Sequence, residues 1–225
     1  MIGHMAAMEN SPVDSTAAPT APLDRTLWWG ALALFTLFAL WVGVERPLAL
    51  NDDSFITLTY IKSLAAGEGW RYNGGAVSLG TTTPLFALLV AGLARLLPAI
   101  EIPSLAIWLD VATWLGAVWL MATGHRTFRL TRWGGIVAAA ALVFPVWIWY
   151  PALGMESPLL VAALLLTCWL AARGHALSAG LLAGALYLIR PEGVAMVPLA
   201  GLWMVWQAGA HRWRVAARYT LGAAV

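Results

Sequence analysis

The chain has 225 residues, of which 61% are hydrophobic and 11% charged. This composition is typical of a polytopic membrane protein, and so are its fourteen tryptophans, because tryptophan favours bilayer interfaces. The net charge of +2 indicates no nucleic-acid partner, and the single cysteine, Cys168, excludes an internal disulfide.

The N-terminal residues are polar and rich in Ala, Pro, Ser and Thr, so we expect 1–26 to be a disordered cytoplasmic tail. Residues 27–44 carry no charge over eighteen positions, which is long enough to cross a bilayer, and we interpret them as an uncleaved signal-anchor. Further apolar runs predict the remaining transmembrane spans: 103–123, 133–150, 158–172, 176–189 and 193–209.

Two adjacent carboxylates, Asp52 and Asp53, follow the first apolar run at or near a membrane surface. Charges at membrane depth are costly, which favours a proton-accepting or cation-binding role for the pair. The simpler alternative is a solvated loop with a helix cap. The apolar spacing after the pair predicts a short amphipathic helix over 54–66 that lies along the membrane.

The next apolar segment, 84–98, allows two topologies. It contains Arg95, is bounded by prolines, and would be roughly 22 Å long as a helix, against about 30 Å of hydrocarbon. If it lies on the surface and the N-terminus is cytoplasmic, the Arg-rich loop 125–132 falls inside. The polar loop 45–102 and the turns at Glu156 and Arg190 then fall outside. If it spans, the N-terminus is outside and the Lys/Arg bias is stronger. We prefer the first topology because it gathers the unusual polar motifs on one face.

Three polar positions interrupt the later apolar runs. Glu156 precedes a proline, and its simplest role is to cap the next helix. Arg190 and Glu192 flank Pro191 in a break that is either a snorkelling arginine with a proline turn or part of a site. Asp110 lies within a span, where it is expected to pair with Arg95, to line a polar cavity or to serve packing by hydrogen bonding.

Four motifs in order resemble bacterial membrane glycosyltransferases of the GT-C fold. They are Asn-Asp-Asp-Ser-Phe-Ile at 51–56 (followed by Tyr60 and by Leu-Ala-Ala-Gly-Glu-Gly-Trp at 64–70), Thr-Thr-Thr-Pro-Leu-Phe at 81–86, Gly-Met-Glu-Ser-Pro-Leu at 154–159 and Arg-Pro-Glu-Gly at 190–193. The nearest similarity is to arabinofuranosyl- and mannosyltransferase-like members, which use polyprenyl-phosphate sugars. The resemblance covers about residues 27–210.

The resemblance implies an all-α, polytopic transmembrane bundle of GT-C type, with two interfacial helices, 54–66 and 84–98, in its first outer loop. It implies an active site on the extracytoplasmic face of the plasma (inner) membrane, where a sugar moves to a glycan, lipid or protein acceptor. Asp52 is then the expected general base, with Asp53 as its partner or as a metal ligand. The further site candidates are Glu156, Glu192, Tyr60 and Thr82.

The chemistry fits these residue types. An acceptor hydroxyl is a poor nucleophile, so a carboxylate must take its proton as it attacks the anomeric carbon. The lipid phosphate leaves as an anion and needs a cation: Arg190, Arg71, Arg95, or Mg²⁺ or Mn²⁺ held by the aspartates. A single base without a covalent intermediate implies inversion.

Members of the family are usually about twice this length, so we expect the chain to be C-terminally incomplete, and whether it is active alone stays open. A lipid-linked sugar transporter or flippase is a second class, with Asp110 and the break at Arg190 as its midplane site. The absence of an internal repeat counts against it. A membrane scaffold or an inactive fragment is the third class.

Overall fold

The computed structural model describes residues 22–45, 50, 52–142 and 154–224, and within these ranges the protein is all-helical apart from one isolated β-bridge, Arg71 to Val77. The predicted all-α class is confirmed for this part of the chain. The helices are α1 (Pro22–Glu45), α2 (Asp52–Ala65), α3 (Pro84–Leu96), α4 (Ile102–Thr123), α5 (Arg132–Leu142), α7 (Ser157–Ala172), α8 (Ala176–Ile189), η2 (Pro191–Ala195), α9 (Met196–Gln207), η3 (Gly209–His211) and α10 (Arg212–Ala223).

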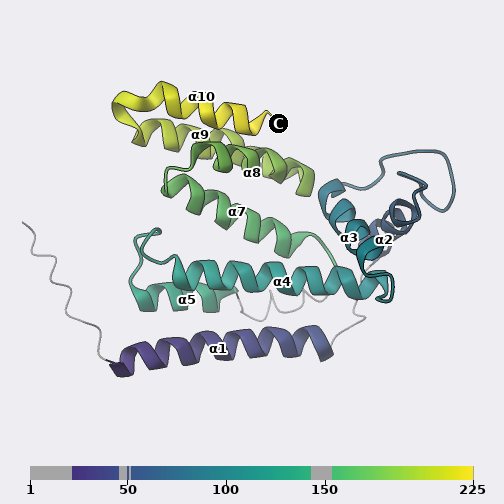
Figure 1. Ribbon diagram of the computed structural model, residues 1–225, viewed down its shortest axis with the longest axis horizontal. Helices are drawn as coiled ribbons and strands as arrows, with labels where there is room; N and C mark the ends of the chain where they lie inside the picture. Colours follow the sequence, from purple (N-terminus) through teal and green to yellow (C-terminus); the bar gives the residue numbers. More distant parts are fainter. Residues whose placement is uncertain (1–21, 46–49, 51, 143–153, 225) are drawn as a thin grey trace, which may run out of the picture.

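The helices form a stack with a small helical pair at one end. Figure 1 shows α1, α4 with α5, α7, α8 and then α9 with α10 lying side by side, while α2 and α3 group beside the end where α4 and α7 begin. Prolines explain several of these starts. Pro84, Pro103, Pro158 and Pro191 each occupy a first or second position of an element, where a missing N–H costs nothing.

Most predicted segments coincide with helices, with differences at their ends. The first helix begins at Pro22 rather than at 27, and α2 begins at Asp52 rather than at 54. The segment 84–98 forms α3, which ends at Leu96. The run 133–150 forms α5 up to Leu142, and its remainder lies outside the described residues. The run 193–209 is divided between η2 and α9, because Pro191 starts a separate turn.

Among the described residues, α4 is the helix that is long and apolar enough to cross a membrane. Four shorter apolar helices accompany it: α3, α5, α7 and α8. The uncharged run 27–44 lies within α1. The helix α10 has no counterpart among the predicted spans. Its three arginines interrupt the apolar pattern in the sequence, although one face of the helix is apolar and packs on α8.

Small residues let α8 and α10 approach closely. A Cβ added at Gly184 would lie 2.8 Å from the Ala223 carbonyl oxygen, and one added at Gly180 would overlap the Tyr219 carbonyl group. The Tyr219 hydroxyl donates a hydrogen bond to the Val197 carbonyl at 2.8 Å and so ties α10 to α9 as well. The three helices therefore form one tightly packed unit.

A second core joins α2, α3 and α4. Leu58, Ile61, Phe86, Val90 and Leu105 are all buried in it. Leu85, at the start of α3, packs on Leu186 and Ile189 near the end of α8. The starts of α3 and α7 and the end of α8 therefore meet at one end of the stack.

Most acidic residues of the stack lie at one end, together with Lys62, Arg71, Arg95 and Arg190, while the other end carries mainly arginines. We call the end where α2, α3, α4 and α7 begin and α8 finishes the acidic end; it carries Asp52, Asp53, Glu156 and Glu192. The opposite end, the basic end, holds the turns between α4 and α5, between α7 and α8, and before α10 (Figure 1). Its cationic residues are Arg126, Arg129, Arg132, Arg173, Arg212 and Arg214.

Candidate functional site

The turn before α7 is held against the rest of the acidic end. Gly154 has a positive φ of 62°, which favours glycine. A Cβ added there would lie 2.8 Å from Leu50, just before α2, and 3.6 Å from the Ala106 side chain on α4. The Gly-Met-Glu motif is thus a tight turn that delivers Glu156 between α2 and α4.

The chain reverses after α8 at Arg190. This residue is extended, with φ −152° and ψ 142°, and Pro191 then starts η2. Gly193 packs on the last turn of α8, since a Cβ there would lie 2.5 Å from the Leu186 carbonyl oxygen. The Arg-Pro-Glu-Gly motif therefore turns α9 back along α8 (Figure 1). The contacts of Arg190 with Glu156 and Glu192 place its side chain at the acidic end.

Two motifs far apart in sequence meet in an ion pair. Arg190 Nε lies 3.3 Å from Glu156 Oε1 and 3.6 Å from Glu192 Oε2. The Nε atom has no partner of hydrogen-bond geometry, so these contacts are electrostatic. Glu156 is buried, at 3% exposure, whereas the Arg190 side chain is 36% exposed. Glu156 occupies the N-cap position of α7, as predicted, but its side chain makes no capping hydrogen bond; its carboxylate faces Arg190 instead.

Burial raises the pKa of Glu156, and the neighbouring charges of Glu192 and Asp53 raise it further. The backbone of Glu156 itself and the Arg190 guanidinium act in the opposite direction, without cancelling the effect of burial. Leu50, just before α2, lies against Gly154, and the Asp53 charge acts on Glu156, so the start of α2 lies close to the Glu156–Arg190 pair. We call Asp53, Glu156, Arg190 and Glu192 the acidic-end cluster.

Asp110 is fully buried in α4, two turns from the start of the helix. Neither carboxylate oxygen has a hydrogen bond of standard geometry, although the Met155 backbone interacts with the carboxyl group and Glu156 is close enough to act on it. The predicted pairing with Arg95 is wrong, since Arg95 is bound elsewhere. Asp110 instead lies next to the turn that contains Met155 and Glu156.

Asp52 and Asp53 occupy the first turn of α2, where the helix dipole favours negative charge. Both are exposed. The Asp53 charge acts on Glu156, and because consecutive side chains on a helix point in different directions, Asp52 does not point the same way as Asp53. Thr82 is exposed just before α3, between the buried Thr81 and Thr83.

Two candidate phosphate ligands serve the backbone instead. Arg71 donates to the carbonyl groups of Glu68 at 3.2 Å and Gly75 at 2.9 Å, and so closes its own loop. Arg95 Nε donates to the Ala65 carbonyl at 3.0 Å, and its guanidinium also binds the Leu64 carbonyl at 2.6 Å. These contacts satisfy carbonyl groups at the end of α2. A donor-binding role for Arg71 and Arg95 stays a prediction.

Tyr60 has a comparable structural place. It is buried, its hydroxyl accepts a hydrogen bond from the Gly80 N–H at 3.1 Å, and its ring packs 6.2 Å from that of Trp70. Tyr60 thereby attaches the loop before α3 to α2. The candidates that the structure brings together are thus Asp53, Glu156, Arg190 and Glu192, with Asp52 beside them.

These features define an all-helical protein with a charged cluster built from three segments distant in sequence. Comparison with protein-family models, with curated proteins and with solved structures found no match. Among the described residues, no three His, Cys, Asp or Glu side chains form a group that could hold a metal ion.

Sequence reasoning did not find the link between Asp110 and the Glu156 turn. Both residues interrupt apolar runs, which is the only sign the sequence offers that they could meet. Their separation along the chain hides the contact, because it depends on how α7 packs on α4.

Proposed function

We propose that the chain is the membrane part of a glycosyltransferase of GT-C type, which moves a sugar from a polyprenyl-phosphate donor to an extracytoplasmic acceptor with inversion. The observation that carries this proposal is the cluster itself. Asp53, Glu156, Arg190 and Glu192 come from three of the four motifs that resemble the family, and they gather at one end of the helical stack. Such gathering is expected of a site and not of scattered helix caps.

In this proposal Asp52 is the general base. It is exposed, so an acceptor hydroxyl can approach it, and its side chain does not point the same way as that of Asp53. It takes the hydroxyl proton as the oxygen attacks the anomeric carbon and as the bond from that carbon to the phosphate oxygen breaks. Asp53, the next residue of α2, adds its negative charge to the acidic-end cluster beside Glu156.

Arg190 is the proposed cation for the leaving phosphate. More than a third of its side chain is exposed. Burial raises the pKa of the Glu156 carboxyl group beside it, which favours the neutral form of that group. When Glu156 takes up a proton, Arg190 loses one competing anion and is freer to pair with phosphate. Glu192 is 72% exposed and offers the weaker competition.

A divalent metal fits this proposal in one way only. Mg²⁺ is commonly held by one or two carboxylates while substrate phosphates complete its coordination. Asp52 or Asp53 can supply one such ligand, but adjacent helical side chains do not converge on one ion. Mg²⁺ or Mn²⁺ would supply charge neutralisation at the donor phosphate. Loss of activity on chelation, restored by Mg²⁺ or Mn²⁺, is the expected sign of that role.

The separation of charges supports a multi-pass topology in the inner membrane of a bacterium, with the basic end of the stack on the cytoplasmic side. Cytoplasmic loops carry an excess of arginine and lysine. Asp53→Cys and Arg126→Cys, each in a Cys168→Ser background, test this at opposite ends. An impermeant maleimide added to intact cells should label the first and spare the second. The reverse labelling pattern would place the acidic-end cluster on the cytoplasmic side of the membrane and would contradict the proposed topology.

The activity test uses membranes that contain the full chain, with polyprenyl-phosphate-linked mannose and arabinofuranose as radiolabelled donors. Asp52→Asn should lower transfer by about 10²- to 10⁴-fold, the range lost when a general base is removed. Glu101→Gln, an exposed acid before α4, is the matched control and should keep full activity. Equal transfer by the two variants would refute the assignment of the base.

A transporter is less well supported. The break at Arg190, which would be its midplane site, lies at the end of α8, where α9 turns back along that helix (Figure 1). Helices that are broken at a transport site continue across the membrane on the far side of the break. A reversal at the end of a helix gives no such path.

A further inference from the structure

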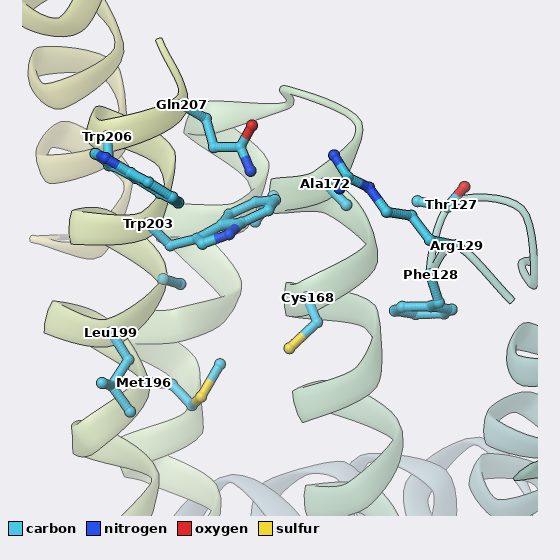
Figure 2. Close-up of a pocket in the computed structure, with 12 residues that line it drawn as sticks. Thr127, Phe128, Arg129, Cys168, Ala172, Met196, Leu199, Trp203, Trp206 and Gln207 are labelled. Atoms are coloured by element: carbon cyan, nitrogen blue, oxygen red, sulfur yellow. The ribbon is translucent and has the colours of Figure 1, made fainter. Parts of the chain in front are cut away.

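A groove lies towards the other end of the stack, away from the acidic-end cluster. It is lined by α7, by α9 and by residues 127–129 of the turn after α4, and Figure 2 shows this turn on the other side of α7 from α9. Its volume is about 560 Å³. Most of its lining is apolar: Phe128, Ala171, Met196, Leu199, Ala200 and Trp203, with Cys168, Trp206, Gln207 and Arg129 completing the walls.

The dimensions of the groove fit one leaflet of a bilayer. From Met196 to Gln207 its α9 wall rises through eleven residues, or about 16 Å, which is close to half of the hydrocarbon thickness of about 30 Å. Trp206 is 80% exposed at the end near Gln207, and tryptophan is the side chain that favours the bilayer interface. The Cys168 side chain points towards the groove from α7 (Figure 2).

A cationic side chain, that of Arg129, lies at the same end of the groove as Trp206. Figure 2 shows the Arg129 side chain reaching towards Ala172 above Phe128 and Cys168. Arg129 has a φ of 56°, a left-handed conformation that costs an arginine about 1–2 kcal/mol. The turn keeps it there through backbone hydrogen bonds, among them Leu130 N–H to the His125 carbonyl at 2.8 Å. Strain retained in a non-glycine residue is a sign of function.

The stretches of sequence that contain the turn after α4 and helix α7 hold no acidic residue. From Val111 to Met155 and from Ser157 to Pro191 the sequence contains no acidic residue, while Arg126, Arg129 and Arg173 lie in these stretches. An anion from outside the chain would balance this charge. In a bilayer, that anion is the headgroup of an anionic lipid.

We propose that this groove binds an anionic phospholipid, with an acyl chain against Trp203, Leu199 and Cys168 and the headgroup phosphate on Arg129. The charge at one end, the apolar walls and the length of one leaflet all fit this ligand. The proposal rests on the membrane placement given above, but it does not depend on sugar transfer.

The single cysteine makes the test direct. We label Cys168 with a small bimane maleimide in the full chain and reconstitute it in nanodiscs with brominated phosphatidylglycerol or brominated phosphatidylcholine, whose acyl chains quench the fluorophore on contact. Phosphatidylglycerol should quench more strongly at equal mole fraction. Arg129→Gln should lower this preference about fivefold, because the charged contact with the headgroup phosphate is lost. Arg126→Gln, an exposed arginine of the same turn outside the groove, should leave it unchanged.

A second measurement avoids the label. Unlabelled Cys168 should react more slowly with N-ethylmaleimide in phosphatidylglycerol nanodiscs than in phosphatidylcholine, and Arg129→Gln should remove the difference. Equal quenching by both lipids would refute the proposal, as would equal losses in the two arginine variants, since a diffuse surface potential would then suffice. Cross-linking of Cys168 between two chains would instead identify a second copy as the occupant. Failure of the protein to co-float with vesicles would refute the membrane placement itself.

Discussion

The Glu156–Arg190 pair allows a sharp test of the acidic-end cluster. The change is Arg190→Gln, which keeps a polar side chain of moderate length and removes the positive charge. Glu156 would remain buried at 3% exposure with Glu192 and Asp53 as its remaining charged neighbours, both of the same sign. The variant should therefore be less stable at alkaline pH.

The expected loss follows from the burial of the two partners. Removing one member of a fully buried ion pair costs about 3–5 kcal/mol. The Arg190 side chain is 36% exposed, so solvent screens part of the interaction, and we expect about 1–3 kcal/mol at pH 8. The raised pKa of Glu156 fixes the sign of the pH dependence. Glu156 contributes to the free energy of unfolding at pH values below 4.5, the ordinary pKa of glutamate in the unfolded chain. This contribution is lost as the pH rises through the raised pKa of Glu156 in the folded protein.

The assay is unfolding in mixed micelles, followed by circular dichroism at pH 5 and at pH 8. Arg190→Gln should cost less at pH 5, because Glu156 can take up a proton there. Adding Glu156→Gln to the variant should recover much of the stability at pH 8, since the unpaired buried charge is gone. An equal loss at both pH values, or no recovery in the double variant, would refute the reasoning.

Three further predictions concern packing and the loop contacts. Gly180→Ala should lower stability by about 1–3 kcal/mol in the same assay, because its methyl group overlaps the Tyr219 carbonyl; Gly116→Ala, which meets nothing within 4 Å, should cost nothing. Arg95→Gln should speed hydrogen exchange in the last turn of α2 by about tenfold, through loss of two hydrogen bonds worth about 1–2 kcal/mol; unchanged exchange would contradict the bracing role. Tyr60→Phe should make residues 66–83 more sensitive to limited proteolysis, since the Gly80 N–H loses its acceptor; unchanged cleavage would contradict it.

The helices were predictable wherever an apolar run is uninterrupted. Residues 103–123 and 158–172 differ from α4 and α7 by one residue at the start, because a proline marks each beginning. The helix α10 was not predicted as a separate element. Its arginines break the apolar pattern, and its small-residue contact with α8 is a tertiary feature.

The sequence marks the members of the acidic-end cluster, but it marks residues outside the cluster as well, and it does not show which of them pair. The sequence marks Glu156 and Arg190 as polar interruptions, and the structure joins them. It marks Arg71 and Arg95 equally, but these bind carbonyl groups that only the turns around them expose. A charged residue in a loop cannot be assigned to a ligand or to the backbone until the path of that loop is known.

The close contact between α8 and α10 bears on the order in which the protein is assembled during synthesis. These helices are separated in the chain by α9, yet Gly180 and Gly184 of α8 pack on the backbone of Tyr219 and Ala223. The glycine face of α8 therefore leaves the ribosome well before its partner does. Until Ala223 has emerged, that face needs another neighbour, such as lipid or an insertion chaperone, and this unit reaches its final shape only after α10 has been synthesised.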